Sequence, residues 1–231
     1  MKYKHLFFDL DHTLWDFEAN ARATLLELHH HMKLEERGIL DFDLFHKNYL
    51  AHNEHLWERY RKGLIKQDEL RTKRMKLSLL DFKIADDILA KEMSIRFLEL
   101  LPTMTILFPG TKEVLGFLTE KKYQLHLITN GFEATQHSKL KFSGLYKFFD
   151  AIVTSESSNS LKPRKEIFEY AFQKTSARQE ESIMIGDNIE VDIMGAMNAG
   201  IDQVYVNHLG TTSAIQPTFI VHHLKELETI F

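Results

Sequence analysis

The sequence contains no cysteine, so the chain can form no disulfide and offers no thiolate ligand to a metal ion. Proline is scarce as well, with four in 231 residues and none between residues 16 and 100. That segment also holds only two glycines, Gly38 and Gly63. Because proline and glycine are the residues that disfavour helix interiors most, their scarcity there favours long helices.

Long apolar runs and a strong excess of charge are also missing. No stretch approaches the roughly 20 apolar residues needed to cross a bilayer, so we expect no membrane partner. The net charge of −4 gives no electrostatic reason to expect polymeric nucleic acid as a partner. Met1–His5 leads directly into an apolar run, which predicts that no signal peptide is present and that the protein is cytoplasmic.

The segment of residues 16–100 has the apolar spacing of amphipathic helices. Apolar side chains recur three or four positions apart in successive runs, which predicts four helices packed as a bundle. Two of these runs contain Leu25, Leu28 and Met32, and Phe45, Tyr49 and Leu56.

From residue 102 onward, short apolar runs alternate with helical stretches, which predicts an α/β fold with a parallel sheet and helices on both faces. The apolar run Leu6–Phe8 would be the first strand of that sheet. The predicted core is therefore residues 1–15 and 101–231, with residues 16–100 inserted as a helical lid. The later predicted strands are Leu125–Thr129, Ala151–Thr154, Ile183–Gly186 and Gln203–Val206, and the helices are Thr111–Lys121, Glu133–Phe142, Lys165–Lys174 and Glu190–Ala199.

Asp9 and Asp11 directly follow the first predicted strand, at the edge where open α/β sheets bind ligands. Two neighbouring carboxylates are costly to bury unless a cation or a proton compensates their charge. The pair suits a carboxylate nucleophile beside a carboxylic acid, as needed to make and break an aspartyl ester or phosphate. The alternative is an ordinary helix cap formed by Asp11 or Thr13.

Three further polar clusters follow later predicted strands. Each has an ordinary structural explanation when taken alone: a turn, an exposed lysine before a helix, or an acidic residue near a helix N-terminus. The clusters are Thr129-Asn130-Gly131, Lys162-Pro163, and Gly186-Asp187-Asn188 with Asp192.

The four clusters, taken in this order, resemble the haloacid dehalogenase-like superfamily of phosphohydrolases over nearly the whole chain. The resemblance implies a Rossmann-like core, a helical cap inserted after the first motif, and Mg²⁺ as cofactor. It also implies that Asp9 is the nucleophile that forms an aspartyl-phosphate and that Asp11 is the acid/base. Thr13 would support the motif loop.

For the remaining clusters the resemblance implies contacts with the phosphoryl group and the metal. Thr129, with Asn130 and Gly131, would bind the phosphoryl group, and Lys162 would neutralise its charge and steady Asp9. The implied metal ligands are the Asp9 carboxylate, the Asp11 carbonyl and Asp187, with Asp192 holding the metal's water shell or the lysine. Mg²⁺ favours such oxygen ligands.

The reaction class can be narrowed by Asp11, because dehalogenase members of the superfamily generally lack this second aspartate. We therefore expect a phosphomonoesterase whose partner is a small phosphate ester. A phosphatase for phosphoglycolate or sugar phosphates, a phosphomutase, and a phosphate-binding regulatory module remain alternatives. Loss of Asp9, Asp11, Lys162 or Asp187 would favour the regulatory module, but all four residues are present.

Leu56–Ile65 and Ile128–Phe132 resemble bacterial pyrimidine 5′-nucleotidases of this superfamily, which implies a nucleoside monophosphate substrate. The sequence departs from that pattern at Ser157–Ser160, before Lys162. Four side chains are candidates for contact with the leaving group, through stacking on a base or through a ribose or phosphate oxygen. They are Trp57, Tyr60, Phe132 and Arg74, and the alternative is that the aromatic residues pack the cap and Arg74 lies on a solvated face.

Overall fold

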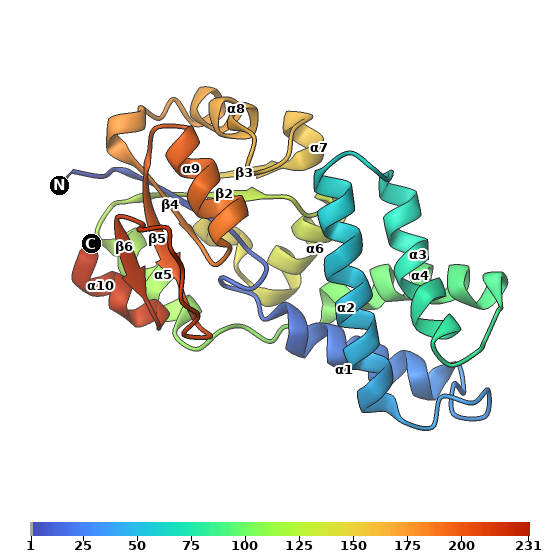
Figure 1. The fold of residues 1–231 in the computed structure, drawn as a ribbon. Helices are drawn as coiled ribbons and strands as arrows, with labels where there is room; N and C mark the ends of the chain where they lie inside the picture. The colour runs from blue at the N-terminus through green and yellow to red at the C-terminus, as the bar shows by residue number, and fades with distance from the viewer. Residues whose placement is uncertain (1) are drawn as a thin grey trace. The chain divides into compact units, whose positions relative to one another are not determined.

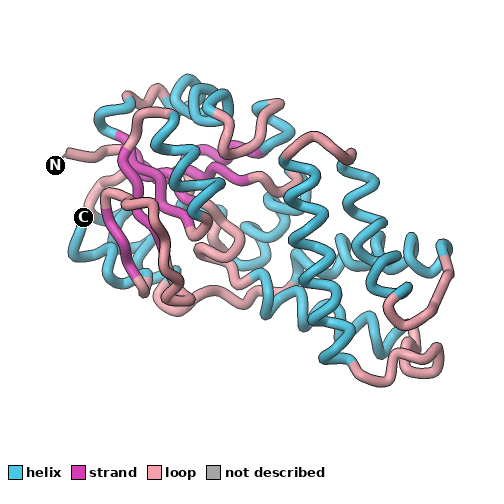
Figure 2. Tube along the Cα trace, in the orientation of Figure 1, coloured by secondary structure: helices cyan, strands magenta, loops and turns pink. Residues whose placement is uncertain are grey.

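The structure, a computed structural model, describes residues 2–231 and divides them into two compact units. One unit takes the described residues up to Phe17 together with Thr105–Phe231. The other, expected over residues 16–100, spans Glu18–Met104. Within the described residues, all strands belong to the first unit, while the second is helical (Figure 2).

The first unit is built on a six-stranded sheet in the order β3-β2-β1-β4-β5-β6, with every neighbouring pair parallel. The five predicted strands are confirmed within one residue at each end. The sixth is only three residues long and has no periodicity that sequence analysis can detect. The strands are β1 (His5–Phe8), β2 (Gln124–Thr129), β3 (Ala151–Thr154), β4 (Ser182–Gly186), β5 (Asp202–Val206) and β6 (Phe219–Val221).

The strand order reverses direction beside β1. The chain runs outward from β1 through β2 to β3, and then returns to the other side of β1 as β4. Phe8 lies in register with Leu127 of β2 and with Ile185 of β4. Residues that follow β1 and β4 therefore meet at the point where the topology switches, which is where open parallel sheets bind their ligands.

Helices cover both faces of the sheet, which confirms the predicted fold class. On one face α8 (Lys165–Thr175) and α9 (Met194–Asn198) pack through Phe168 and Ala196 against Phe7 and other buried strand residues. On the other face lie α5 (Thr111–Glu120) and α10 (Leu227–Ile230) (Figure 1). Successive strand residues point to opposite faces, so a run such as Leu6–Phe8 must be apolar throughout when both faces are covered.

The second unit contains the four predicted helices. The Asp41 side chain accepts a hydrogen bond from the Leu44 amide at the start of its helix, and Asp86 does the same for Leu89. Tyr49 and Phe97 are fully buried between the helices. These helices are α1 (Phe17–His31), α2 (Phe42–Arg61), α3 (Gln67–Leu80) and α4 (Asp87–Leu100).

The segment predicted as one helix over Glu190–Ala199 instead begins with a π-helical turn, Ile189–Ile193, and becomes α-helical only at Met194. The Ile193 amide donates to the Asn188 carbonyl, five residues back, at 3.2 Å. Such turns occur frequently at functional sites. The other helices are α6 (Glu133–Ser143), α7 (Ser155–Ser158) and the 3₁₀ turns Leu101–Thr103, Tyr146–Phe148, Gln179–Glu181 and Leu224–Glu226.

Ser157–Ser160, where the sequence departs from the nucleotidase pattern, overlaps the end of α7. Thr154 and Ser157 cap this single turn reciprocally, and Asn159 ends it in the left-handed region with a φ of 50°. Within residues 2–231, no helix combines the length and the apolar character that crossing a membrane would need.

Candidate active site

The loop after β1 is a tight turn that carries Asp11. The amides of Leu14 and Trp15 both donate to the Leu10 carbonyl at 2.9 Å. His12 lies in the left-handed region with a φ of 63°, a conformation that histidine adopts more readily than most residues. The turn leaves the Asp9 side chain 14% exposed and the Asp11 side chain 23% exposed.

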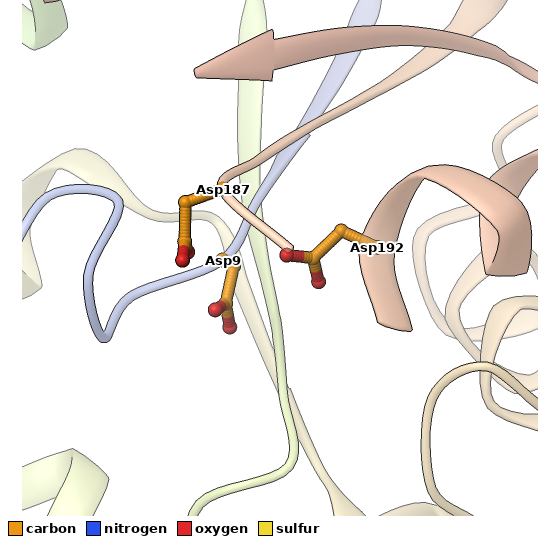
Figure 3. A group of neighbouring side chains, drawn as sticks. All are labelled: Asp9, Asp187 and Asp192. Atoms are coloured by element: carbon orange, nitrogen blue, oxygen red, sulfur yellow. The ribbon is translucent and has the colours of Figure 1, made fainter. Parts of the chain in front are cut away.

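Three carboxylates converge beyond the ends of β1 and β4. Oxygen atoms of Asp9, Asp187 and Asp192 all lie within 4.8 Å of one another (Figure 3). Asp9 follows β1, Asp187 follows β4, and Asp192 comes from the π-helical turn. Thr13 donates its hydroxyl hydrogen bond to Asp187 at 2.7 Å, and so ties the first motif loop to the end of β4.

Lys162 is the cation in this group and is 1% exposed. Its ammonium lies 2.8 Å from Asp9 Oδ1, and it donates to Asp192 Oδ1 at 2.6 Å and to the Ile128 carbonyl at 2.7 Å. Asn130 clamps the lysine's backbone, accepting from its N–H at 2.7 Å and donating to its carbonyl at 2.9 Å. These contacts fix both ends of the lysine, so its charge stays beside Asp9.

Burial sets the electrostatics of the cluster. It raises the pKa of Asp9 to about 8 against the opposing pull of Lys162. It also raises the pKa of Asp187, together with the negative charge of Asp192, to about 7. Burial lowers the pKa of Lys162, but the carboxylates of Asp192 and Asp9 outweigh burial and the net shift is upward.

The cluster fits a divalent cation. Three carboxylates face one lysine charge, so the group is left with excess negative charge when the acids are ionised. Asp192 already uses Oδ1 for Lys162 and Oδ2 for the Asn188 amide, which leaves Asp9 and Asp187 as the freer donors. Hard oxygen donors of this kind suit Mg²⁺.

Close packing explains the glycines of the second and fourth motifs. A Cβ on Gly131 would lie 1.7 Å from Gln136 Nε2, and one on Gly186 would lie 2.5 Å from the Asp192 carboxylate. The Gly131 amide donates to Thr129 Oγ1 at 3.0 Å. In this structure, therefore, the Gly131 N–H and the Asn130 side chain bind protein atoms, and Thr129 Oγ1 accepts hydrogen bonds from the Gly131 amide and from Gln136 Nε2.

Two residues of α6 that the sequence analysis missed contact Asp11. Lys139 donates to Asp11 Oδ1 at 2.5 Å, and Gln136 donates to Oδ2 at 2.7 Å. Both are almost completely buried, at 2% and 1% exposure. The only signal in the sequence was their spacing of three, which places them on one face of a helix that begins just after the second motif.

The four candidate leaving-group residues lie in both units. Trp57 and Tyr60 are half-buried on α2, with ring centroids 5.6 Å apart in an edge-to-face arrangement. Phe132 is buried at the start of α6.

The alternative position predicted for Arg74, on a solvated helix face, is wrong. Arg74 is 2% exposed, donates to Asn53 Oδ1 at 3.0 Å, and holds its guanidinium 4.8 Å from the Phe97 ring centroid. All these partners belong to the helical unit. The structure therefore favours packing over substrate contact as the role of Arg74.

The chain is similar to known proteins over most or all of its length. A family model described as haloacid dehalogenase-like hydrolase matches residues 3–200. Pyrimidine 5′-nucleotidase PynA of Streptococcus pneumoniae is 33% identical over 230 residues, covering 98% of this chain and 94% of its own. Pyrimidine 5′-nucleotidase YjjG of Escherichia coli is 29% identical over 233 residues, covering 100% and 98%. The magnesium-bound crystal structure of HAD-hydrolase YfnB from Bacillus subtilis superimposes with a TM-score of 0.89 at 29% identity, over 100% and 99% of the two chains.

Proposed function

This chain belongs to the haloacid dehalogenase-like hydrolases, and from that premise we propose that it is a Mg²⁺-dependent phosphomonoesterase that forms an aspartyl-phosphate on Asp9. The observation that carries the proposal is the group of Lys162, Asp9, Asp187 and Asp192 at the topological switch point, in which Lys162 and Asp192 are buried and Asp9 and Asp187 are partly exposed. A carboxylate held beside one fixed cation, with acidic oxygens left over for a metal ion, is the minimum that such chemistry requires.

Asp9 is the proposed nucleophile. Lys162 contacts Oδ1, which leaves Oδ2 to attack phosphorus. The bond from phosphorus to the leaving oxygen breaks as the bond to Asp9 forms, and Asp11 supplies the proton that the leaving oxygen needs. Water then attacks the aspartyl-phosphate while Asp11 takes up a proton, which releases inorganic phosphate and restores both carboxyl groups.

Mg²⁺ would be held by the Asp9 and Asp187 carboxylates and the Asp11 backbone carbonyl, with Asp192 supporting its water shell. When bound it supplies positive charge against the phosphoryl oxygens. Thr129 would donate its hydroxyl to a phosphoryl oxygen, and Asn130 would contribute through its backbone. The magnesium found in the related YfnB supports this assignment.

The proposed substrates are pyrimidine nucleoside 5′-monophosphates. Support comes from PynA and YjjG, two relatives of nearly full length that carry this name. Trp57, Tyr60 and Phe132 are the proposed stacking partners of the base. The helical unit is the proposed lid, and the interdomain movement described for YfnB is consistent with a lid that opens and closes.

A screen of phosphate release, with and without Mg²⁺, tests the proposal. The panel would include pyrimidine and purine nucleoside monophosphates, phosphoglycolate and sugar phosphates. We expect kcat/KM to be highest for pyrimidine nucleotides and to be lost in Asp9→Asn, because an amide cannot attack phosphorus. The variant should keep a native circular dichroism spectrum.

Three results would contradict the proposal at different levels. Turnover near that of the unsubstituted protein in a folded Asp9→Asn variant would remove Asp9 from the nucleophile role. A kcat/KM that is highest for phosphoglycolate or a sugar phosphate would keep the chemistry and replace the substrate. Transfer of the phosphoryl group to a second position of the substrate, without phosphate release, would identify a phosphomutase.

A further inference from the structure

Helix α6 holds both oxygens of the Asp11 carboxylate, one with Lys139 and the other with Gln136. We propose that these two side chains are positioning residues that orient Asp11 for proton transfer to the leaving oxygen. The proposal rests on the function proposed above, since it assigns a task to the same acid/base. Neither residue belongs to the four sequence motifs.

Lys139 has little freedom to point anywhere else. Its side chain is 3% exposed, and its ammonium lies 4.1 Å from the ring centroid of Trp15 and 5.6 Å from that of Phe17. A buried ammonium is costly without a partner of opposite charge, and aromatic faces offset only part of that cost. The 2.5 Å contact with Asp11 Oδ1 provides the partner. The lysine and the carboxylate therefore fix each other's position.

Gln136 links Asp11 to the phosphate-binding motif. The same amide nitrogen donates to Asp11 Oδ2 at 2.7 Å and to Thr129 Oγ1 at 3.0 Å. Its path runs through the space that a Cβ on Gly131 would occupy, so the absence of a side chain at Gly131 is what admits it. One amide thus sets the spacing between the hydroxyl that would hold the phosphoryl group and the carboxyl that would protonate its leaving oxygen.

This arrangement leaves Asp11 able to react. Each carboxylate oxygen has two lone pairs, and a single hydrogen bond to each oxygen leaves a lone pair free for the transferred proton. General acid catalysis requires the proton to lie within hydrogen-bond reach of the acceptor. If the Asp11 side chain rotated freely, it would be oriented for proton transfer in only a fraction of the bound complexes. The contribution of the two residues should therefore be largest where protonation of the leaving group matters most.

Leaving-group dependence separates this role from a merely structural one. Phenyl phosphate and 4-nitrophenyl phosphate are nearly the same size, but phenolate is the more basic leaving group and needs the proton more. Lys139→Met and Gln136→Leu should lower kcat/KM for phenyl phosphate by about 10- to 100-fold and for 4-nitrophenyl phosphate by less than about 5-fold. Lys139→Arg should restore part of the loss, because it keeps a cation beside Asp11.

Two variants calibrate the result. Lys141→Met makes the same change on an exposed position of α6 and should behave like the unsubstituted protein. Asp11→Asn should show the same leaving-group pattern with a larger loss. If Lys139→Met does not fold, as judged by thermal melting, Gln136→Leu carries the test, since it removes the second contact without removing a charge.

Equal losses on both substrates, or no loss on either, would overturn the positioning role. Failure of the proposed function would be seen separately, as turnover that survives Asp9→Asn. A folded Asp9→Asn variant without activity, combined with Lys139→Met and Gln136→Leu variants that match Lys141→Met, would leave the proposed function intact and reject this inference alone.

Discussion

His5 and His126 pack together on neighbouring strands β1 and β2, with His5 Nδ1 3.0 Å from His126 Nε2 and the rings stacked. His126 is 2% exposed, and burial lowers its pKa to about 4, with a smaller contribution from His5. The folded protein therefore holds His126 neutral in the pH range where an unfolded chain would already protonate it.

The free energy of unfolding should consequently fall as the pH drops from about 6.5 to about 4. The unfolded state binds the additional proton in that window, because its histidine has the higher pKa. The loss attributable to His126 should reach about 2 to 3 kcal/mol. Urea unfolding at several pH values would measure it, and His126→Gln should flatten the slope. An unchanged slope in that folded variant would assign the acid sensitivity to other groups.

Individual site residues could be predicted from the sequence when they interrupt an apolar pattern, and were missed when they lie where polar residues are common. Asp9 and Asp187 stand out because they follow apolar strands, and the structure brings them within the same 4.8 Å cluster. Lys139 and Gln136 do not stand out, because a lysine and a glutamine on a helix are usually solvated. Only the packing of α6 against the first motif loop reveals their partner.

At the scale of single elements, the start of α6 depends on Gly131. Gly131→Ala should displace Gln136, whose amide nitrogen would lie 1.7 Å from the new Cβ. We expect a loss of about 1 to 3 kcal/mol in the free energy of unfolding, as in other overpacked sites, together with at least about a 10-fold loss of kcat/KM for phenyl phosphate.

Gly116→Ala is the matched control, because nothing lies within 4 Å of a Cβ at that position in α5. Alanine in a helix interior should stabilise the protein by about 0.5 to 1 kcal/mol without changing activity. Thermal melting and steady-state kinetics of both variants measure the two effects. Gly131→Ala with unchanged kinetics would show that the Gln136 contact is dispensable.

The π-helical turn is an element that hydrophobic spacing could not predict. An amphipathic pattern over residues 190–199 is compatible with an ordinary helix, and the extra residue of the turn becomes visible only in the hydrogen bond from Ile193 to Asn188. The turn places Asp192, which is fully buried, against Lys162. The turn is held by local contacts as well as by this tertiary one, because Asp192 Oδ2 accepts from the Asn188 amide and Asn188 Oδ1 accepts from the Val191 amide.

At the scale of the whole molecule, the excess of carboxylates predicts dependence on a metal ion. Removal of divalent cations with a chelator should abolish hydrolysis, Mg²⁺ should restore it, and Ca²⁺ should restore it poorly. The larger ion accepts more ligands and a looser geometry than the octahedral arrangement of Mg²⁺. Phosphate release measured after dialysis and re-addition checks this, and full activity in excess chelator would remove the metal from the mechanism.

The helical unit supports a second prediction at this scale. Trp57→Ala and Tyr60→Ala should lower kcat/KM for a pyrimidine nucleotide by about 10- to 100-fold, the loss expected for one base-stacking contact of about 1 to 3 kcal/mol. They should spare 4-nitrophenyl phosphate, whose leaving group needs little recognition. His55→Ala, at an exposed position of α2, is the control. Equal losses on both substrates would assign the aromatic residues to packing.

The class of the fold and the order of its motifs could be predicted from the amino-acid sequence alone. Apolar runs of strand length, alternating with helical spacing, specify a parallel sheet, because each strand must be apolar where helices cover both faces. The polar residues that end these runs then have to meet at one edge. Asp9 and Asp187 directly follow such runs, whereas Lys162 lies in a loop beyond the third predicted strand, and its role was implied by the resemblance to the haloacid dehalogenase-like superfamily.

The polar contacts of these groups, in contrast, became known from the folded structure. It assigned the Asn130 amide to the Lys162 backbone, placed Arg74 inside the helical unit, and brought Lys139 and Gln136 to Asp11. Each of these contacts joins residues that are distant in the chain through one or two hydrogen bonds or an ion pair. Hydrophobic periodicity reports which face of an element is buried, but the choice of polar partner depends on the packed positions of side chains, which local sequence does not encode.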